Sequence, residues 1–125
     1  MQDFFAAVTA GELPDALLTS DMRAWTTTQG SMDKAAYQRL VRLLAKISAR
    51  PLVFTIDSVT AEEERIVAEA HSEGTLVNGE EYKNTYVFVF RIRDGRIASL
   101  AEHFNALIAQ DKMVPLVRAI ARQES

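Results

Sequence analysis

The segment Asn78–Asn105, NGEEYKNTYVFVFRIRDGRIASLAEHFN, decides the fold. It contains Asn78-Gly79 and Asp94-Gly95, two residue pairs suited to tight hairpin turns, because both central positions of such turns need positive φ. Between and after these pairs the side chains follow the two-residue period of extended backbone. The segment therefore predicts a strand over Glu81–Ile92 and a last strand over Arg96–Asn105, paired as an antiparallel hairpin.

Two further strands are predicted before this hairpin. The two-residue period begins at Leu52 and gives strand candidates at Leu52–Val59 and Arg65–Leu76, separated by the charged turn Ala61–Glu64. Four strands that follow one another through short turns form an antiparallel meander. We expect that meander to extend from Leu52 to Asn105.

The N-terminal part of the chain is predicted to be mainly helical. Asp3–Ala10 and Asp33–Ala49 carry apolar residues at helical spacing, and Leu13–Leu18 fits a short helical turn. Asp21–Thr28 is a strand candidate, because its tryptophan and three threonines favour extended backbone. Arg50-Pro51 is expected to end the long helix, since proline disfavours helical backbone in the residue before it. Helices followed by a long meander predict an α+β domain.

The composition is that of a single globular domain spanning residues 1–125. Apolar residues make up 48% of the chain and charged residues 25%, and the net charge is −3. This charge argues against nucleic acid or an anionic membrane as a partner. The absence of cysteine excludes a disulfide framework, a thiolate zinc site and a cysteine nucleophile. No apolar run has the length of a membrane span and no leader opens the chain, so a cytoplasmic location is expected.

The alternation along the last two strands predicts the wall of a pocket. An apolar or aromatic face with a few fixed polar groups is what a site for a small hydrophobic molecule requires. We expect that such a molecule is the partner of this domain. The substrate-binding candidates are Trp25, Tyr82, Asn84, Tyr86, Phe88, Leu100 and Phe104.

Glu102 is the main candidate for chemistry. It shares a strand face with Leu100 and Phe104, and a carboxylate on an apolar face loses hydration. That loss raises its pKa toward the range useful for proton transfer. The alternative is a fixed carboxylate that only satisfies the pocket through a hydrogen bond to Tyr82 or Asn84.

The hairpin segment resembles the SnoaL-like and ketosteroid-isomerase-related branch of the nuclear transport factor 2-like superfamily. The resemblance consists of a G-x-x-Y-x-N-x-Y strand, a D-G-[KR]-I turn and an E-Y-x-D strand end. The matching residues are Gly79, Tyr82, Asn84 and Tyr86, then Asp94, Gly95, Arg96 and Ile97, then Glu102, with His103 in place of tyrosine and Asn105 in place of aspartate. The resemblance implies a cone-shaped fold in which a curved antiparallel sheet wraps around the N-terminal helices.

The same resemblance implies a range of activities. Members include steroid isomerases, polyketide cyclases, epoxide hydrolases, dehydratases and binding domains. Steroid isomerisation is not expected, because no carboxylate stands in Trp25–Thr28 or Thr85–Phe90, where those isomerases keep their base and their oxyanion-hole acid. The residues of limonene-epoxide-hydrolase-like members approximately match His71, Glu73 and Glu102.

Two hypotheses therefore stand. In the first, the domain is a cofactor-free isomerase, cyclase or epoxide-hydrolase-like enzyme with Glu102, His71 and Glu73 as catalytic candidates. In the second, it is a binding or assembly domain that holds a hydrophobic ligand without turnover. His71 and Glu73 could instead lie on a solvated or dimer-facing side, and their spacing from Glu102 is too loose to predict a metal site. Neither a metal nor a cofactor is expected.

A homodimer is also expected. Val87 and Val89 alternate away from the aromatic pocket face, so they would leave apolar surface uncovered in a monomer. His103 alternates away from Glu102 and is placed on the same outer face of the sheet.

Overall fold

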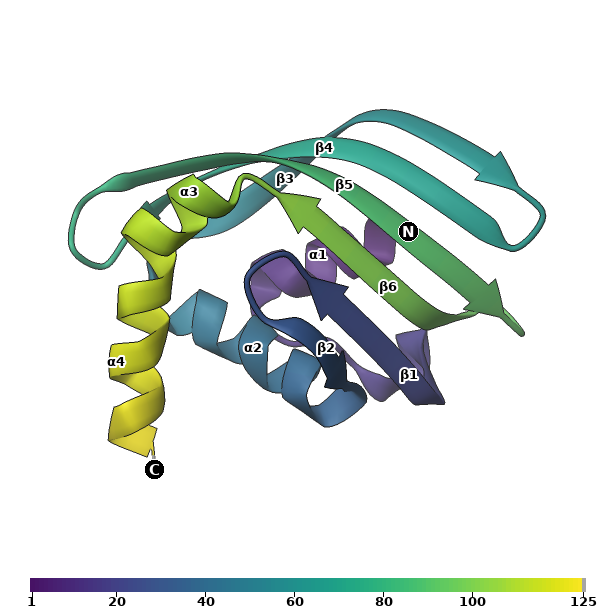
Figure 1. Cartoon of the computed structure of the whole chain (residues 1–125), viewed down its shortest axis with the longest axis horizontal. Coiled ribbons are helices and arrows are strands. Elements are labelled where there is room, and N and C mark those ends of the chain that lie inside the picture. Colours follow the sequence, from purple (N-terminus) through teal and green to yellow (C-terminus); the bar gives the residue numbers. More distant parts are fainter. Residues whose placement is uncertain (125) are drawn as a thin grey trace.

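Six strands and several helical segments make up the computed structural model, which describes residues 1–124 (Figure 1). The helical elements are α1 (Gln2–Ala10), a 3₁₀ turn at Asp15–Leu17, α2 (Lys34–Lys46), α3 (Ala106–Ile108), a π-helical turn at Ala109–Met113 and α4 (Val114–Glu124). The strands are β1 (Leu18–Thr26), β2 (Gly30–Asp33), β3 (Ser48–Glu62), β4 (Arg65–Leu76), β5 (Glu81–Arg93) and β6 (Arg96–Phe104).

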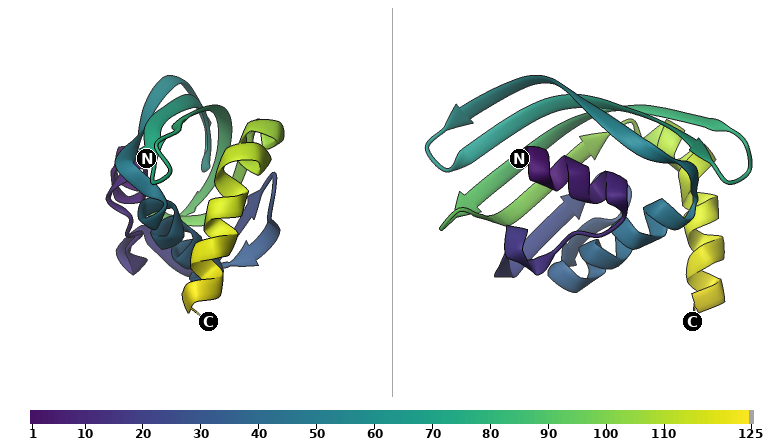
Figure 2. Two further views of the ribbon diagram at one scale, coloured as in Figure 1. Left: turned by 90° about the vertical axis from the view of Figure 1, so that its left-hand side faces the viewer. Right: turned by 180° about the vertical axis from the view of Figure 1, so that it is seen from behind.

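The strands form one mixed sheet in the order β2-β1-β6-β5-β4-β3. The antiparallel meander predicted from the sequence is confirmed as β3 to β6. β1 joins the meander along β6 in parallel, and the short strand β2, which was not predicted, pairs antiparallel with β1. Figure 2 shows the sheet curving over α1 and α2, so one face is concave and covered and the other is convex.

The hairpin turns differ in how they use positive φ. At the β5–β6 turn both Asp94 and Gly95 have positive φ, of 54° and 75°, as the sequence argument requires. At the β4–β5 turn only Gly79 does, with φ of 88°. There the Asn78 side chain accepts a hydrogen bond from the Glu80 backbone N–H at 3.1 Å. The prediction of two positive φ values is thus confirmed at the β5–β6 turn and is wrong at the β4–β5 turn.

The main core lies between α1 and the concave face of the sheet. Phe4 and Phe5 of α1 meet the rings of β5 edge-on, with centroids 5.2 Å apart for Phe4 and Phe90 and 4.9 Å apart for Phe5 and Phe88. Such edge-to-face pairs add to the stabilisation from burial. They fix α1 under the centre of the meander.

The long helix is shorter than its sequence pattern suggests. Asp33 is the N-cap of α2, with its side chain accepting from the Ala36 N–H at 2.8 Å, and α2 ends at Lys46 rather than Ala49. The backbone joins the sheet directly after the helix, because the Ile47 carbonyl accepts a hydrogen bond from the Val77 N–H at 2.8 Å. Pro51 then lies inside β3, which is tolerated because β3 is an edge strand.

A C-terminal helical segment, Ala106 to Glu124, was not predicted from the sequence. Its start is capped by Asn105, whose side chain accepts hydrogen bonds from the N–H groups of Leu107 and Ile108. Figure 1 shows α4 descending beside one end of the cone, next to the end of α2. Among the described residues, no helix is both long enough and apolar enough to cross a membrane.

Candidate functional site

A cavity of about 50 Å³ lies between the concave face of the sheet, α2 and the C-terminal helical segment. At roughly 10–15 Å³ for each water molecule, this space admits about four. Most of its wall is aromatic or aliphatic, and Glu102 is the one charged residue in the part of the wall that residues 1–124 provide.

Glu102 reaches the cavity from β6, where it pairs with Phe88 of β5 and with Thr26 of β1. Its Oε1 accepts a hydrogen bond of 2.7 Å from the Tyr37 hydroxyl of α2. Protein groups surround the carboxyl, and the accessible surface that it retains borders the cavity. Burial raises the pKa of Glu102 to about 7, and the Tyr37 hydrogen bond opposes this rise.

The backbone at Glu102 is held by the end of β1. The Glu102 carbonyl accepts from the Thr27 N–H at 3.2 Å and from the Thr27 hydroxyl at 3.3 Å. The same hydroxyl oxygen accepts from the Phe104 N–H at 3.1 Å. Thr27 therefore holds the backbone that follows Glu102, at the Glu102 carbonyl and at the Phe104 N–H, and so fixes the strand from which the carboxyl approaches the cavity.

Three tyrosines accompany Glu102 in the cavity wall. Burial is the main cause that raises the pKa of each, well above the ordinary value for Tyr37 and Tyr86, and the charge of Glu102 adds to the rise in all three. The Tyr86 hydroxyl lies 2.8 Å from the Ser72 hydroxyl, and the Tyr82 hydroxyl accepts from Asn84 at 2.8 Å. All three phenols therefore stay protonated near neutral pH and serve as neutral hydrogen-bonding groups.

Asn84 has a different role from the one that its position in the predicted pocket suggested. Its Nδ2 donates to the Tyr82 hydroxyl at 2.8 Å and to the Asn105 carbonyl at 3.2 Å. Its Oδ1 accepts from the N–H groups of Thr85 at 2.8 Å and Asn105 at 3.0 Å. A side-chain amide has two donor hydrogens and two acceptor positions, so all of them are engaged within the chain. Asn84 fixes the start of the C-terminal helical segment.

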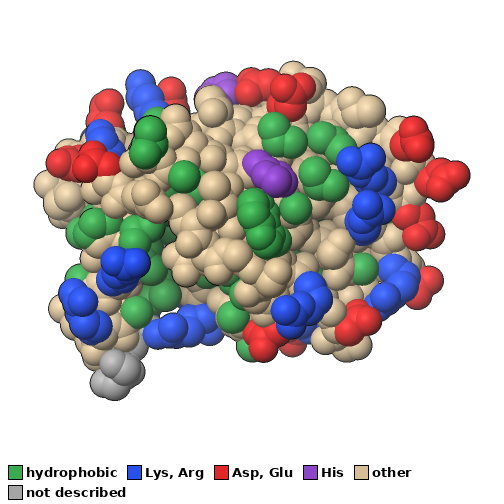
Figure 3. All heavy atoms as spheres, in the orientation of Figure 1, with side chains coloured by type: hydrophobic (Ala, Val, Ile, Leu, Met, Phe, Trp, Pro, Cys, Tyr) green, Lys and Arg blue, Asp and Glu red, His purple; other side chains and the backbone are tan. Residues whose placement is uncertain are grey.

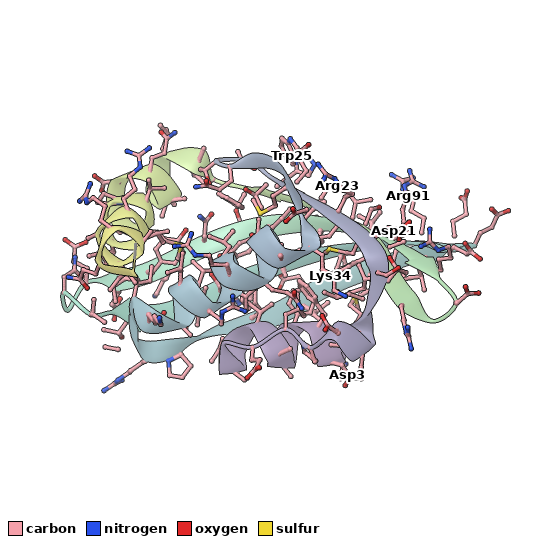
Figure 4. The ribbon with its side chains drawn as sticks, turned by 90° about the horizontal axis from the view of Figure 1, so that it is seen from below. Asp3, Asp21, Arg23, Trp25, Lys34 and Arg91 are labelled. Atoms are coloured by element: carbon pink, nitrogen blue, oxygen red, sulfur yellow. The ribbon has the colours of Figure 1, made fainter. Side chains whose placement is uncertain are left out.

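The other residues predicted to bind substrate divide into three groups. Tyr82, Tyr86, Phe88 and Phe104 line the cavity. Leu100 is buried in the adjoining core. Trp25 lies on the convex face, with its ring 4.7 Å from that of His103, and Figure 4 shows it directed away from the helices together with Arg23.

The prediction that Trp25 lines the pocket is therefore wrong. Its neighbours Ala24 and Thr26 are both buried on the inward side of β1, so the alternation of the strand turns Trp25 outward. The expected outer position of His103 is confirmed by the same contact.

His71 and Glu73 also lie on the convex face, so the expectation that they join Glu102 in one site is wrong. Their neighbours Ala70 and Ser72 are buried on the inner side of β4. The His71 Nδ1 lies 2.9 Å from Asp57 Oδ2 on β3, and Glu73 is 3.9 Å from the Lys83 ammonium. Within the described part of the chain, no cluster of histidine and acidic residues could hold a metal.

Sequence reasoning missed Tyr37, Ser72 and the cavity residues of the C-terminal segment. Tyr37 lies on the apolar stripe of the helix predicted over Asp33–Ala49. A buried tyrosine hydroxyl needs a hydrogen-bond partner, so its place on that stripe was the available signal. Met113, Val114 and Val117 line the cavity, but no pattern before Asn105 predicts where they pack.

The fold and this site define a class: small α+β pocket domains of the nuclear transport factor 2-like type, in which a curved sheet encloses a cavity beside its helices. The chain belongs to the SnoaL-like domain family, whose model matches residues 1–100. The matched part ends just before Glu102. A search of curated proteins finds no match.

Solved structures confirm the fold. A nuclear transport factor 2-like protein from Anabaena variabilis is 24% identical with a TM-score of 0.74, over 83% of this chain and 82% of that one. A proposed isomerase from Bacillus subtilis is 21% identical with a TM-score of 0.75, over 88% and 86%. A proposed SnoaL-like polyketide cyclase from a Jannaschia species is 15% identical with a TM-score of 0.73, over 87% and 85%.

Proposed function

We propose that this protein is a cofactor-independent enzyme that carries out general acid–base chemistry on a small hydrophobic substrate, as an isomerase, cyclase or epoxide-hydrolase-like enzyme. The observation that carries the proposal is Glu102. Its carboxyl lies in an apolar cavity, accepts a hydrogen bond from Tyr37 and has a pKa of about 7. A group with a pKa near the working pH is the most effective general acid or base.

The free oxygen of Glu102 supports a role in proton transfer. Within the described residues Tyr37 is the hydrogen-bond partner of the carboxyl, and it engages Oε1. Oε2 has no hydrogen-bond partner within residues 1–124, so it can take a proton from a substrate bound in the cavity that Glu102 lines. The Tyr37 hydrogen bond holds the carboxyl in one orientation while this happens.

An isomerisation illustrates how the charges balance. Glu102 takes the proton from a carbon beside a carbonyl group, and the electron pair of the C–H bond forms the double bond of an enolate. The Tyr86 hydroxyl can accept a hydrogen bond from Ser72 and donate one to the enolate oxygen, while it keeps its proton. Glu102 then returns the proton to another carbon of the substrate, so the net reaction needs no cofactor.

A non-catalytic binding domain is the second candidate function. The observation that favours it is the wall of the cavity, in which the described residues provide one ionisable carboxyl and otherwise apolar groups and neutral hydroxyl and amide groups. In this case Glu102 and Tyr37 only orient a hydrophobic ligand.

Deuterium exchange distinguishes the two candidates without knowledge of the natural substrate. A panel of small cyclic ketones and enones is incubated with the protein in deuterated water, and exchange next to the carbonyl group is followed by NMR. We expect exchange in at least one compound, lowered about 10²–10⁴-fold by Glu102→Gln, which keeps the shape of the side chain. Compounds that bind to the cavity without any exchange would support the binding domain.

We also propose that the protein forms a homodimer through the convex face of the sheet. Val87 is 38% exposed there, close to Trp25, His103 and Val89, and Figure 3 shows a histidine surrounded by hydrophobic side chains on this face. Apolar surface of this kind often marks an interface. Light scattering at micromolar concentration is expected to give twice the chain mass of 13.9 kDa, and the single-chain mass would refute the dimer.

A further inference from the structure

A second hollow adjoins the cavity on the side of α4. It is an open groove of about 640 Å³ between the β1–β2 turn, α2 and α4, and it is therefore far larger than the inner cavity of about 50 Å³. The two spaces share part of their walls. The shared residues are Thr28, Gln29, Leu40, Val114 and Val117.

The sizes of the two spaces restrict how a substrate can bind. The inner cavity admits about four water molecules, so it can take only the reacting end of most organic substrates. Because the two spaces share wall residues, the remainder of such a molecule can extend into the groove. The groove therefore contacts the part of the substrate that does not react, and the side chains of the groove determine which substrates bind.

The groove offers positive charge. Arg39 of α2 and Arg118 of α4 belong to its wall, and no acidic residue within residues 1–124 does. Both arginines are exposed, so their guanidinium groups lie at the rim rather than on the apolar floor. Figure 3 shows Lys and Arg side chains gathered over the α4 end of the molecule, although the net charge of the chain is −3.

The charge in the inner cavity has the opposite sign to the charge at the groove. Glu102 carries a negative charge above its pKa of about 7, and no basic residue in the described part of the chain lines that cavity. An anionic group would be repelled there and attracted at the groove. The two spaces together thus favour one orientation of an amphipathic anion.

We propose that the groove binds the carboxylate of an amphipathic acid whose apolar end enters the inner cavity beside Glu102. Arg118 is its principal partner, and Arg39 supports it from the opposite wall. A guanidinium presents donors in a planar arrangement that matches a carboxylate. As a statement about substrate this inference rests on the proposed function, but the binding of the acid itself does not require catalysis.

Octanoate and 1-octanol test the groove, because they have the same chain and differ in the charge of the head group. Their affinities are measured by isothermal titration calorimetry at low ionic strength and pH 8. Arg118→Gln is expected to weaken octanoate binding about two- to fivefold and to leave 1-octanol binding unchanged, the size expected for an exposed ion pair. Added salt should weaken octanoate binding to the wild type and have less effect on the variant.

Arg96→Gln is the matched control. Arg96 is also an exposed arginine, but it lies at the β5–β6 turn, far from α4 (Figure 1). It should leave both affinities unchanged. An equal loss of octanoate affinity in Arg96→Gln and Arg118→Gln, or none in Arg118→Gln, would overturn the proposal.

Glu102→Gln separates failure of this inference from failure of the proposed function. If the groove binds the carboxylate, Glu102→Gln retains octanoate binding and strengthens it at pH 8, because the repelling charge has been removed. Deuterium exchange that is unaffected by Glu102→Gln would refute the catalytic role of Glu102 and leave the groove intact. A large gain in octanoate affinity in Glu102→Gln at pH 8, together with no effect of Arg118→Gln, would place the carboxylate in the inner cavity and contradict the groove.

Discussion

The two faces of the meander carry carboxylates with opposite surroundings. On the concave face Glu102 lies in an apolar cavity with a neutral phenol as its hydrogen-bond partner. On the convex face of the same sheet, Glu73 is exposed beside Lys83, and Asp57 is exposed beside His71. All three side chains are carboxylates, but the carboxylate on the concave face is enclosed by apolar groups and those on the convex face are exposed to solvent. Site chemistry in this fold is therefore decided by the inward positions of the strands.

The largest expected effect is on the rate of turnover, when the carboxylate on the concave face is replaced and the result is compared with replacement of one on the convex face. Once an exchanging or reacting compound has been found, Glu102→Gln should lower the rate about 10²–10⁴-fold. Glu73→Gln removes the same charge from the convex face and should leave the rate unchanged. Steady-state kinetics of both variants check this. An equal loss of rate in the two variants would show that the face on which a carboxylate lies does not determine its role in turnover.

The next effect concerns buried and exposed asparagines. Asn84→Ala should lower the free energy of unfolding by about 2–4 kcal/mol, because it removes four hydrogen bonds and leaves buried partners unpaired. Hydrogen exchange should increase first in α3 and α4, since Asn105 loses its anchor. Asn78→Ala removes one exposed hydrogen bond at a turn and should change the free energy by about 0.5 kcal/mol or less. Equal losses would show that Asn84 does not hold the C-terminal segment.

Glu102 should also make stability depend on pH. Its pKa is about 7 in the native state and 4.5 as the ordinary value, so the native state holds the extra proton between these limits. Stability therefore falls as pH rises from 4.5 to 7 and changes no further above 7 through this group. The difference corresponds to about 3 kcal/mol at most.

Denaturant unfolding of the wild type and of Glu102→Gln across this pH range isolates that effect. The free energy of unfolding of the variant should not fall between pH 4.5 and 7, and at pH 8 it should exceed that of the wild type. Parallel curves for the two proteins would mean that burial does not raise the pKa of Glu102.

The smallest effect is expected on the convex face. His71→Ala removes an exposed hydrogen-bonding contact with Asp57, and an exposed contact of this kind is typically worth less than about 1 kcal/mol. Its midpoint of denaturation and its turnover should therefore both stay close to the wild type. A large loss of turnover would restore His71 as a catalytic candidate.

The strands could be predicted from the sequence because their period and turns are local signals. The position of Glu102 on the pocket face followed from the same period. The face of Trp25 could not be predicted in this way, because it depends on the parallel pairing of β1 with β6, which brings together residues far apart in the sequence. The face of His71 is fixed by its alternation with the buried residues Ala70 and Ser72 along β4, and its chemical similarity to residues of related proteins does not determine that face.

The C-terminal segment shows a second limit of the sequence. Its start is joined to β5 by the hydrogen bonds between Asn84 and Asn105, which link residues far apart in the sequence. Tyr37 was recognised as a core residue, but its hydroxyl meets Glu102 only when α2 packs against β6. The site therefore depends on contacts between elements that are distant in the sequence, and local sequence patterns do not specify such contacts.

The pKa of Glu102 tests the central claim most directly. The wild type and Tyr37→Phe are labelled with ¹³C at the glutamate side-chain carboxyl and titrated by NMR, with Glu102→Gln used to assign the signal. We predict a pKa of about 7 in the wild type and a higher pKa in Tyr37→Phe, because the hydrogen bond that opposes the rise is lost. A wild-type pKa at the ordinary value of 4.5 would contradict the account.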